Sequence, residues 1–260
     1  MSLLVDGSPW FVLAVCLALC GVLAVGFRVV LRHHLGTDLD HAHPVAAPLM
    51  PALGAVFALL AATTIGSEAA LYRSAGDDVS AEAAASSRLA WAATSPGVDT
   101  AAIQGELATY LRATRATEWH DGDADGSPKA MAALARLERA VRTEAASKDL
   151  GSAQAGELLA SMDAVSSLRR QRIAHANNRM PDGYLLVVLV SGLALVANSA
   201  ALAVDRRGRV ALLTGGLVVV VALALALLIA ISSPFEGGFV VSGGPIDAVV
   251  GNLRDGAFAP

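Results

Sequence analysis

Long apolar windows and one long polar stretch alternate along the chain. Four windows are almost free of charge, at about 10–31, 45–65, 184–204 and 210–231. A helix of about 20 apolar residues, rising 1.5 Å per residue, crosses a hydrocarbon core of about 30 Å. The pattern therefore predicts four transmembrane helices in two hairpins, the first within residues 1–66 and the second within residues 182–232.

The polar stretch at 67–181 carries most of the charge and follows a helical pattern. Apolar residues recur at three-and-four spacing, as in Ile103, Leu107, Tyr110 and Leu111, and again in Leu158, Met162, Val165 and Leu168. No strand-like alternation interrupts it. No proline follows the second window before Pro96, so its helix can run on through Glu68 and Glu82. The prediction is an all-α membrane protein with an all-α polar domain inserted between the second and third spans.

The tail at 233–260 predicts a short amphipathic helix. Pro245 suits the first helical position and Asp247 the first turn. Its apolar face comprises Ile246, Val249, Val250 and Leu253. Such a helix lies on the membrane surface or docks against the polar domain.

Composition narrows the class of protein. Of 260 residues, 55% are hydrophobic and 16% charged, whereas soluble domains carry about a quarter charged residues. The net charge of -4 provides no basic surplus for nucleic acid. No nucleophile motif, phosphate loop or zinc-hydrolase helix is present, so we expect no enzyme. The expectation is a multi-pass protein of the cell membrane, and the Ala, Val and Arg usage is typical of GC-rich bacteria.

The orientation of the chain in the membrane stays open. The two short loops hold Arg28, Arg32 and Arg206, Arg207 and Arg209, which by the positive-inside rule places the polar domain outside the cytoplasm. Arg73 and the arginines at 169–179 flank the spans on the domain side and point the other way.

An acidic turn offers one candidate metal site. Asp121, Asp123 and Asp125, followed by Gly126, match the first half of a calcium loop. Position twelve of that loop is Ala132, where a bidentate glutamate belongs. A solvated turn between two helices is the favoured interpretation, and calcium binding is the alternative.

The first short loop offers a second candidate metal site. His33, His34, His41 and His43 lie close in sequence and are ligands for a transition metal. None of these pairs has helical i, i+4 spacing, so a solvated interfacial loop is favoured. A pH-sensitive charge at the membrane surface is a third interpretation. We therefore expect no cofactor, with calcium or a transition metal as the alternative.

Ionisable residues are absent from the middle of all four windows, which disfavours a transporter driven by buried carboxylates. Asn198 lies near the centre of the third window and Glu68 just beyond the second. Interhelical packing explains both, and a role in lining a pore is the alternative.

Several residues outside the apolar windows form recognisable motifs. They are Glu82 followed by Arg88, Tyr110, the Glu118-Trp119 pair, Arg170 and Arg172, and the step Pro234-Phe235-Glu236-Gly237. In these the chain resembles the bestrophin-like family of four-span membrane proteins, which is widespread in bacteria and has little assigned biochemistry. It departs from the family pattern after Trp119, where an acidic turn follows, and at Ser232-Ser233, where an Asp is common.

The resemblance implies kinship with bestrophins, which are pentameric anion channels with four spans and a helical cytosolic region. It implies that this chain is one subunit of a ring, that the polar domain is cytosolic, and that the second span lines the pore with Pro48, Pro51, Gly54 and Phe57. Our leading hypothesis is a homo-oligomeric ion channel, for anions. The alternative is a non-conducting, membrane-anchored helical scaffold or sensor subunit of a larger membrane complex.

Overall fold

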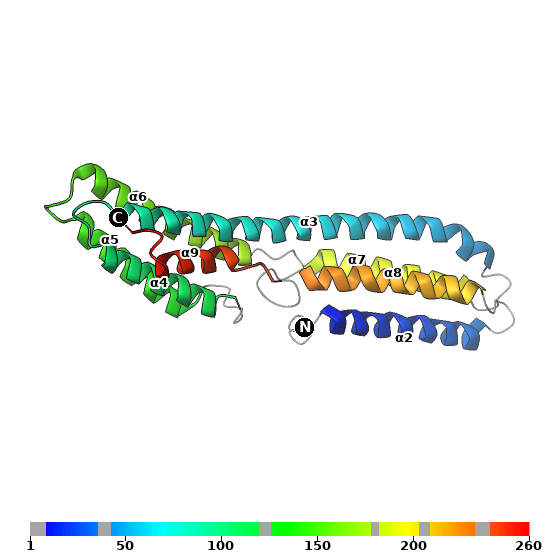
Figure 1. The fold of residues 1–260 in the computed structure, drawn as a ribbon. Helices are drawn as coiled ribbons and strands as arrows, with labels where there is room; N and C mark the ends of the chain where they lie inside the picture. The colour runs from blue at the N-terminus through cyan, green and yellow to red at the C-terminus, as the bar shows by residue number, and fades with distance from the viewer. Residues whose placement is uncertain are drawn as a thin grey trace. The chain divides into compact units, whose positions relative to one another are not determined.

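The computed structural model describes residues 9–35, 43–119, 126–177, 182–202, 209–231 and 240–259. Within them the fold is all-helical, without strands, as predicted (Figure 1). The helices are α2 (Pro9–Leu35), α3 (His43–Ala92), α4 (Thr100–Thr117), α5 (Pro128–Ala145), α6 (Ser152–Asn177), α7 (Asp182–Leu202), α8 (Arg209–Ile231) and α9 (Gly244–Arg254).

The chain divides into two compact units, which are described separately. The first contains α2, α3 as far as Ala70, α7 and α8. The second contains α3 from Leu71 onward, α4, α5, α6 and α9. Helix α3 therefore contributes to both units as one 50-residue helix, and no proline follows Pro51 before Pro96, in the turn beyond its end.

Four of the described helices are long and apolar enough to cross a membrane, and each contributes all or part of its length to the first unit. Their apolar segments are Trp10–Val30, Ala47–Ala92, Gly183–Leu202 and Thr214–Ile231. The first of these helices is longer than expected. Helix α2 extends to Leu35, so His33 and His34 are helical rather than part of a loop, and α3 already begins at His43.

Helix α2 packs against α7 and α8, which also pack against each other. The core of this unit includes Cys16 and Cys20 as buried free thiols, together with Phe57 and Leu195. Large apolar side chains also cover the outer surface, and Trp10 is 79% exposed. Helices that are apolar all round are typical of membrane spans.

Two helices of the second unit, α4 and α5, begin at side-chain caps. Asp99 caps α4 by accepting a hydrogen bond from the Ala102 amide at 3.0 Å. Ser127 caps α5 in the same way, with Pro128 in the first turn. Gly97, in the turn before α4, has a φ of +89°, which glycine adopts at little cost.

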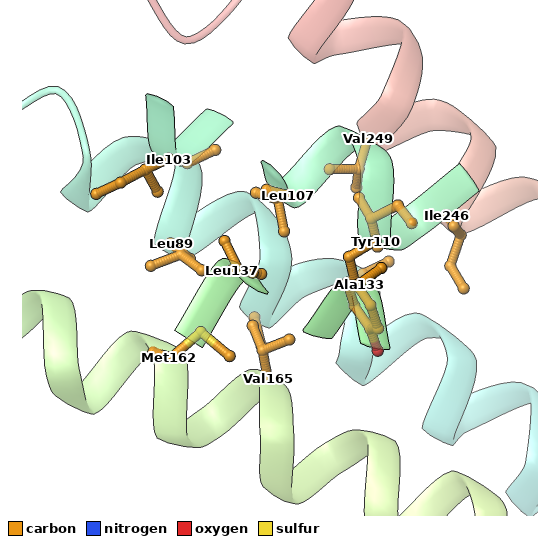
Figure 2. Packing of buried hydrophobic residues seen from close by; sticks show 14 of the residues in the cluster. Leu89, Ile103, Leu107, Tyr110, Ala133, Leu137, Met162, Val165, Ile246 and Val249 are labelled. Atoms are coloured by element: carbon orange, nitrogen blue, oxygen red, sulfur yellow. The ribbon is translucent and has the colours of Figure 1, made fainter. Parts of the chain in front are cut away.

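The core of the second unit lies between α3, α4, α5, α6 and α9. Figure 2 shows Leu89, Leu107, Leu137 and Val165 converging there, each fully buried. Helix α9 packs against α4 and buries Ile246 and Val249. The sequence predicted that the tail helix lies on the membrane surface or docks against the polar domain. The contacts of α9 with α4 agree with docking against the polar domain.

The packing of the first unit predicts a position-specific effect of glycine replacement. A Cβ atom at Gly192 would lie 3.1 Å from both Phe57 Cε2 and Val221 Cγ1, whereas one at Gly215 meets nothing within 4 Å. We expect Gly192→Leu to lower the free energy of unfolding by about 1–3 kcal/mol through overpacking. Thermal unfolding of the purified protein in detergent measures this, with Gly215→Leu as the matched control; equal melting temperatures for the two variants contradict the packing described.

Candidate functional site

The buried faces of three helices carry charged residues as well as apolar ones. The buried stripe of α3 includes Val79, Glu82, Ser86 and Leu89. Helix α6 has a buried stripe of its own, which includes Val165, Arg169 and Arg172. These residues follow three-and-four spacing, so each charge points into the core as the apolar neighbours do. Glu118, at the carboxyl end of α4, completes the set.

Glu82 is fully buried and receives two hydrogen bonds. The Tyr110 hydroxyl donates to Oε1 of Glu82, and Arg172 Nε donates to Oε2 at 2.5 Å. These contacts join α3 to α4 and α6.

Glu118 is also buried and receives three hydrogen bonds. Arg172 Nη2 donates to its Oε2 at 2.6 Å, and Arg169 Nη2 donates to its Oε1. The backbone amide of Ser127 donates to Oε1 at 3.1 Å. Arg172 thus bridges two carboxylates, and the four charges of Glu82, Glu118, Arg169 and Arg172 cancel. We call these four residues with Tyr110 the buried charge cluster.

The turn before α5 leaves room for this cluster only because residue 126 is a glycine. Gly126 has a φ of +81°, and a Cβ atom there would lie 2.8 Å from Ile173 Cδ1 and 3.1 Å from Arg169 Nη2. Both the backbone conformation and the close approach require glycine. Gly126 therefore has a packing role beside Arg169.

Trp119 covers one side of the cluster. The Arg172 guanidinium lies 5.2 Å from its ring centroid and that of Arg115 lies 5.3 Å away, which are cation–π distances. The indole Nε1 donates to the Val241 carbonyl at 2.8 Å, and Arg115 pairs with Asp247 at 3.2 Å. The Glu118-Trp119 pair therefore joins the cluster to the tail: Glu118 pairs with Arg172, and Trp119 donates to the Val241 carbonyl.

The electrostatics of the cluster favour a charged Arg172 and a neutral Tyr110. Burial opposes the charge of Arg172, but the adjacent Glu82 and Glu118 carboxylates outweigh it and raise its pKa. Burial, reinforced by the Glu82 carboxylate, raises the pKa of Tyr110 well above its ordinary value. The cluster is suited to holding helices together, because each carboxylate accepts hydrogen bonds from at least two donors.

A second polar contact joins α3 to α6 next to the cluster. His175 Nδ1 lies 2.5 Å from Asp78 Oδ2, and Gln171 Nε2 donates to Asp78 Oδ1 at 2.9 Å. Asp78 precedes Glu82 by one helical turn. Its side chain is 5% exposed, and that of His175 is 38% exposed.

The structure brings together five of the residues that carried the resemblance, namely Glu82, Tyr110, Glu118, Trp119 and Arg172. Arg88 and Arg170 are exposed instead. Pro234, Phe235 and Gly237 lie outside the described residues. Sequence reasoning missed Arg169, Asp78 and His175. Continuing the apolar stripe of α6 at three-and-four spacing reaches Arg169 and Arg172 and passes over Arg170, and this signal identifies the buried arginines.

The candidate pore residues do not share one face of the first unit. Pro48 and Pro51 are exposed and Gly54 is half-buried, whereas Phe57 is 5% exposed and packs toward α7 and α8. Asn198 is half-buried, and its Nδ2 lies 3.5 Å from Met50 Sδ.

The metal candidates remain predictions. Among the residues that the structure describes, no group of three or more His, Cys, Asp or Glu side chains is placed to hold a metal ion. Asp121, Asp123, Asp125 and His41 lie outside those residues. Of the helical histidines, His33 is exposed.

Together, the all-helical fold and its four apolar helices point to a membrane protein. A family model described as the bestrophin-like domain matches residues 13–246, and the chain belongs to this family. A solved structure of a bacterial bestrophin homologue from Klebsiella pneumoniae, carrying a point mutation, is similar over 96% of this chain and 100% of that one, with 14% identity and a TM-score of 0.46. No curated protein matches the sequence significantly.

The cluster predicts a large difference between two neighbouring arginines. Replacing Arg172 by Ala leaves Glu82 and Glu118 buried with an uncompensated charge, and we expect a loss of about 3–5 kcal/mol in the free energy of unfolding. Arg170→Ala, on the exposed face of the same helix, is the matched control, with an expected change within about 0.5 kcal/mol. Chemical unfolding followed by tryptophan fluorescence measures both; similar losses for the two variants contradict the assignment.

The raised pKa of Tyr110 predicts that the free energy of unfolding falls at alkaline pH. Its raised pKa means that, above about pH 10, the unfolded chain releases this proton while the folded protein retains it. The contribution is therefore present below pH 10 and declines as pH rises toward the folded-state pKa. We expect a steeper loss of stability between pH 9.5 and pH 11, roughly the range above the ordinary tyrosine pKa, for the native protein than for Tyr110→Phe. Parallel slopes for the two proteins refute this.

Proposed function

We propose that this chain is a subunit of a homo-oligomeric, multi-pass ion channel of the cell membrane, that it conducts anions, and that helix α3 lines the conducting path. One observation carries the assignment of α3. In its apolar part, one face buries Phe57, Ala61 and Thr64 against the other spans, while Val56 and Leu59 on the opposite face are 50% and 66% exposed. A helix arranged in this way presents a second face to lipid or to another copy of the chain.

The chemistry of that exposed face supports an apolar pore. Pro48, Pro51, Val56 and Leu59 are exposed there, and no Asp, Glu, Lys or Arg occurs from residue 45 to residue 67. Hydrophobic constrictions gate channels by excluding water, and rings of Asp or Glu favour cations. A path without carboxylates is compatible with anions, and membership of the bestrophin-like family favours this selectivity.

The burial of α3 side chains also changes which residues we assign to the path. Phe57 packs against Gly192 and Val221 of its own subunit, so we assign it to the core of the bundle. We assign Pro51, Val56 and Leu59 to the path.

Cysteine substitution tests the assignment directly. In a background with Cys16 and Cys20 replaced by Ala, Val56→Cys or Leu59→Cys is placed in liposomes and treated with a charged, thiol-specific methanethiosulfonate reagent. We expect chloride flux in the untreated protein and a fall of about tenfold or more on modification, because a charge in an apolar constriction is strongly unfavourable. Phe57→Cys is the matched control, and its flux is expected to stay unchanged.

Two results contradict the proposal. One is the absence of ion flux from a protein that runs as a monomer in mild detergent. The other is flux that responds to modification at Phe57→Cys and at neither exposed position. Absence of flux together with a stoichiometric co-purifying protein supports the scaffold or sensor alternative instead.

A further inference from the structure

A cleft of about 220 Å³ lies between α5 and α6 in the second unit. Its walls combine apolar side chains, Leu134, Leu159 and Met162, with charged ones. The volume is smaller than the roughly 300–1,000 Å³ of sites for drug-sized ligands. It suits a small molecule with an apolar part and a charged part.

Arg169 connects this cleft to the buried charge cluster. It lines the cleft and is 4% exposed. Its Nη2 donates to Glu118, but its buried Nε has no hydrogen-bond partner among the described residues. A buried donor without a partner costs about 1–3 kcal/mol, and such groups in native proteins call for an explanation. The Arg169 side chain therefore brings a buried positive group with an unused donor to the wall of the cleft.

The charges along α6 favour an anionic group at the end of the cleft lined by Ser166, Arg169 and Arg170. Arg170 follows Arg169 and has no ion-pair partner among the described residues, and Ser166 lies one turn earlier on the same wall. Arg142 is paired with Glu138 at 2.5 Å, so these two charges offset each other. Asp163 opposes an anion, but seven residues separate it from Arg170, which is about 10 Å along a helix.

The apolar wall distinguishes an organic anion from an inorganic one. Met162 is 3% exposed, whereas Leu159, on the same helix, is 44% exposed. A short hydrocarbon chain covering Leu159 gains about 25 cal/mol for each Å² removed from water, which phosphate or chloride does not. We infer that the α5–α6 cleft binds a small organic carboxylate, held by Ser166, Arg169 and Arg170 with its hydrocarbon part against Leu134, Leu159 and Met162. This site is independent of ion conduction.

Isothermal titration of the full-length protein in detergent with butyrate tests the site, at constant ionic strength and against three comparators. Butyramide has nearly the same shape as butyrate but no charge. Acetate lacks most of the hydrocarbon part of butyrate, and inorganic phosphate lacks all of it. We expect saturable binding of butyrate, with butyramide, acetate and phosphate each at least about tenfold weaker, which corresponds to about 1.4 kcal/mol.

Variants on the exposed side of the cleft separate binding from folding. Arg170→Gln is expected to weaken butyrate binding about tenfold, as the loss of a charge-assisted hydrogen bond predicts. Asp163→Asn is expected to strengthen it, because a repulsive charge is removed. Arg139→Gln, an exposed arginine of α5 outside the cleft, is the control and is expected to leave the affinity unchanged.

Three results overturn the inference. They are no saturable binding of butyrate, equal binding of butyrate and butyramide, and an affinity for butyrate that Arg170→Gln leaves unchanged. Equal binding of phosphate and butyrate also overturns the assignment of an organic ligand.

Discussion

The second unit depends on the requirement that every buried charge be paired. Glu82 and Glu118 lose their hydration, a cost of several kcal/mol for each ion even after relaxation. Arg172 and Arg169 offset that cost through contacts of which the two from Arg172 measure 2.5 and 2.6 Å. Because the two carboxylates come from α3 and the end of α4 and both arginines from α6, the charges are satisfied only when all three segments are in place. The cluster thus specifies one arrangement of helices that are otherwise held by interchangeable Ala and Leu contacts.

Much of the fold could be predicted because the two units bury their apolar residues in different patterns. Windows without charge identify membrane spans by length alone, and the stripe of Leu158, Met162 and Val165 identifies an amphipathic helix. Helix ends were harder to place. Helix α2 runs on to Leu35, past Arg28 and Arg32, because charged side chains at a span end do not stop a helix, and no glycine or proline lies between Gly26 and Gly36.

The cluster was only partly predictable. The resemblance pointed to Glu82, Tyr110, Glu118, Trp119 and Arg172, but nothing in sequence spacing shows that Glu118 lies beside Arg172, 54 positions later. That proximity follows from the turns between α4 and α6. Arg170 and Arg169 are equivalent by composition and differ only by 100° around the helix, which is enough to expose one and bury the other.

Helix α3 links the chemistry of the two units within one element. Its first part is apolar on all sides and contributes Phe57 and Ala61 to the core of the first unit, and its second part carries Asp78 and Glu82 into the polar contacts of the second. The tail reaches the same region through Trp119 and Val241. The second unit therefore combines the buried charge cluster, a tail that contacts Trp119 and a cleft lined by Arg169.

The most direct test of the cluster is a double-mutant cycle between Glu82 and Arg172. The free energies of unfolding of Glu82→Gln, Arg172→Met and the double variant are compared with that of the native protein. The account predicts that the double variant loses less stability than the sum of the single variants, with a coupling energy of about 2 kcal/mol or more, because each single change leaves a buried charge unpaired. Additivity within about 0.5 kcal/mol contradicts it.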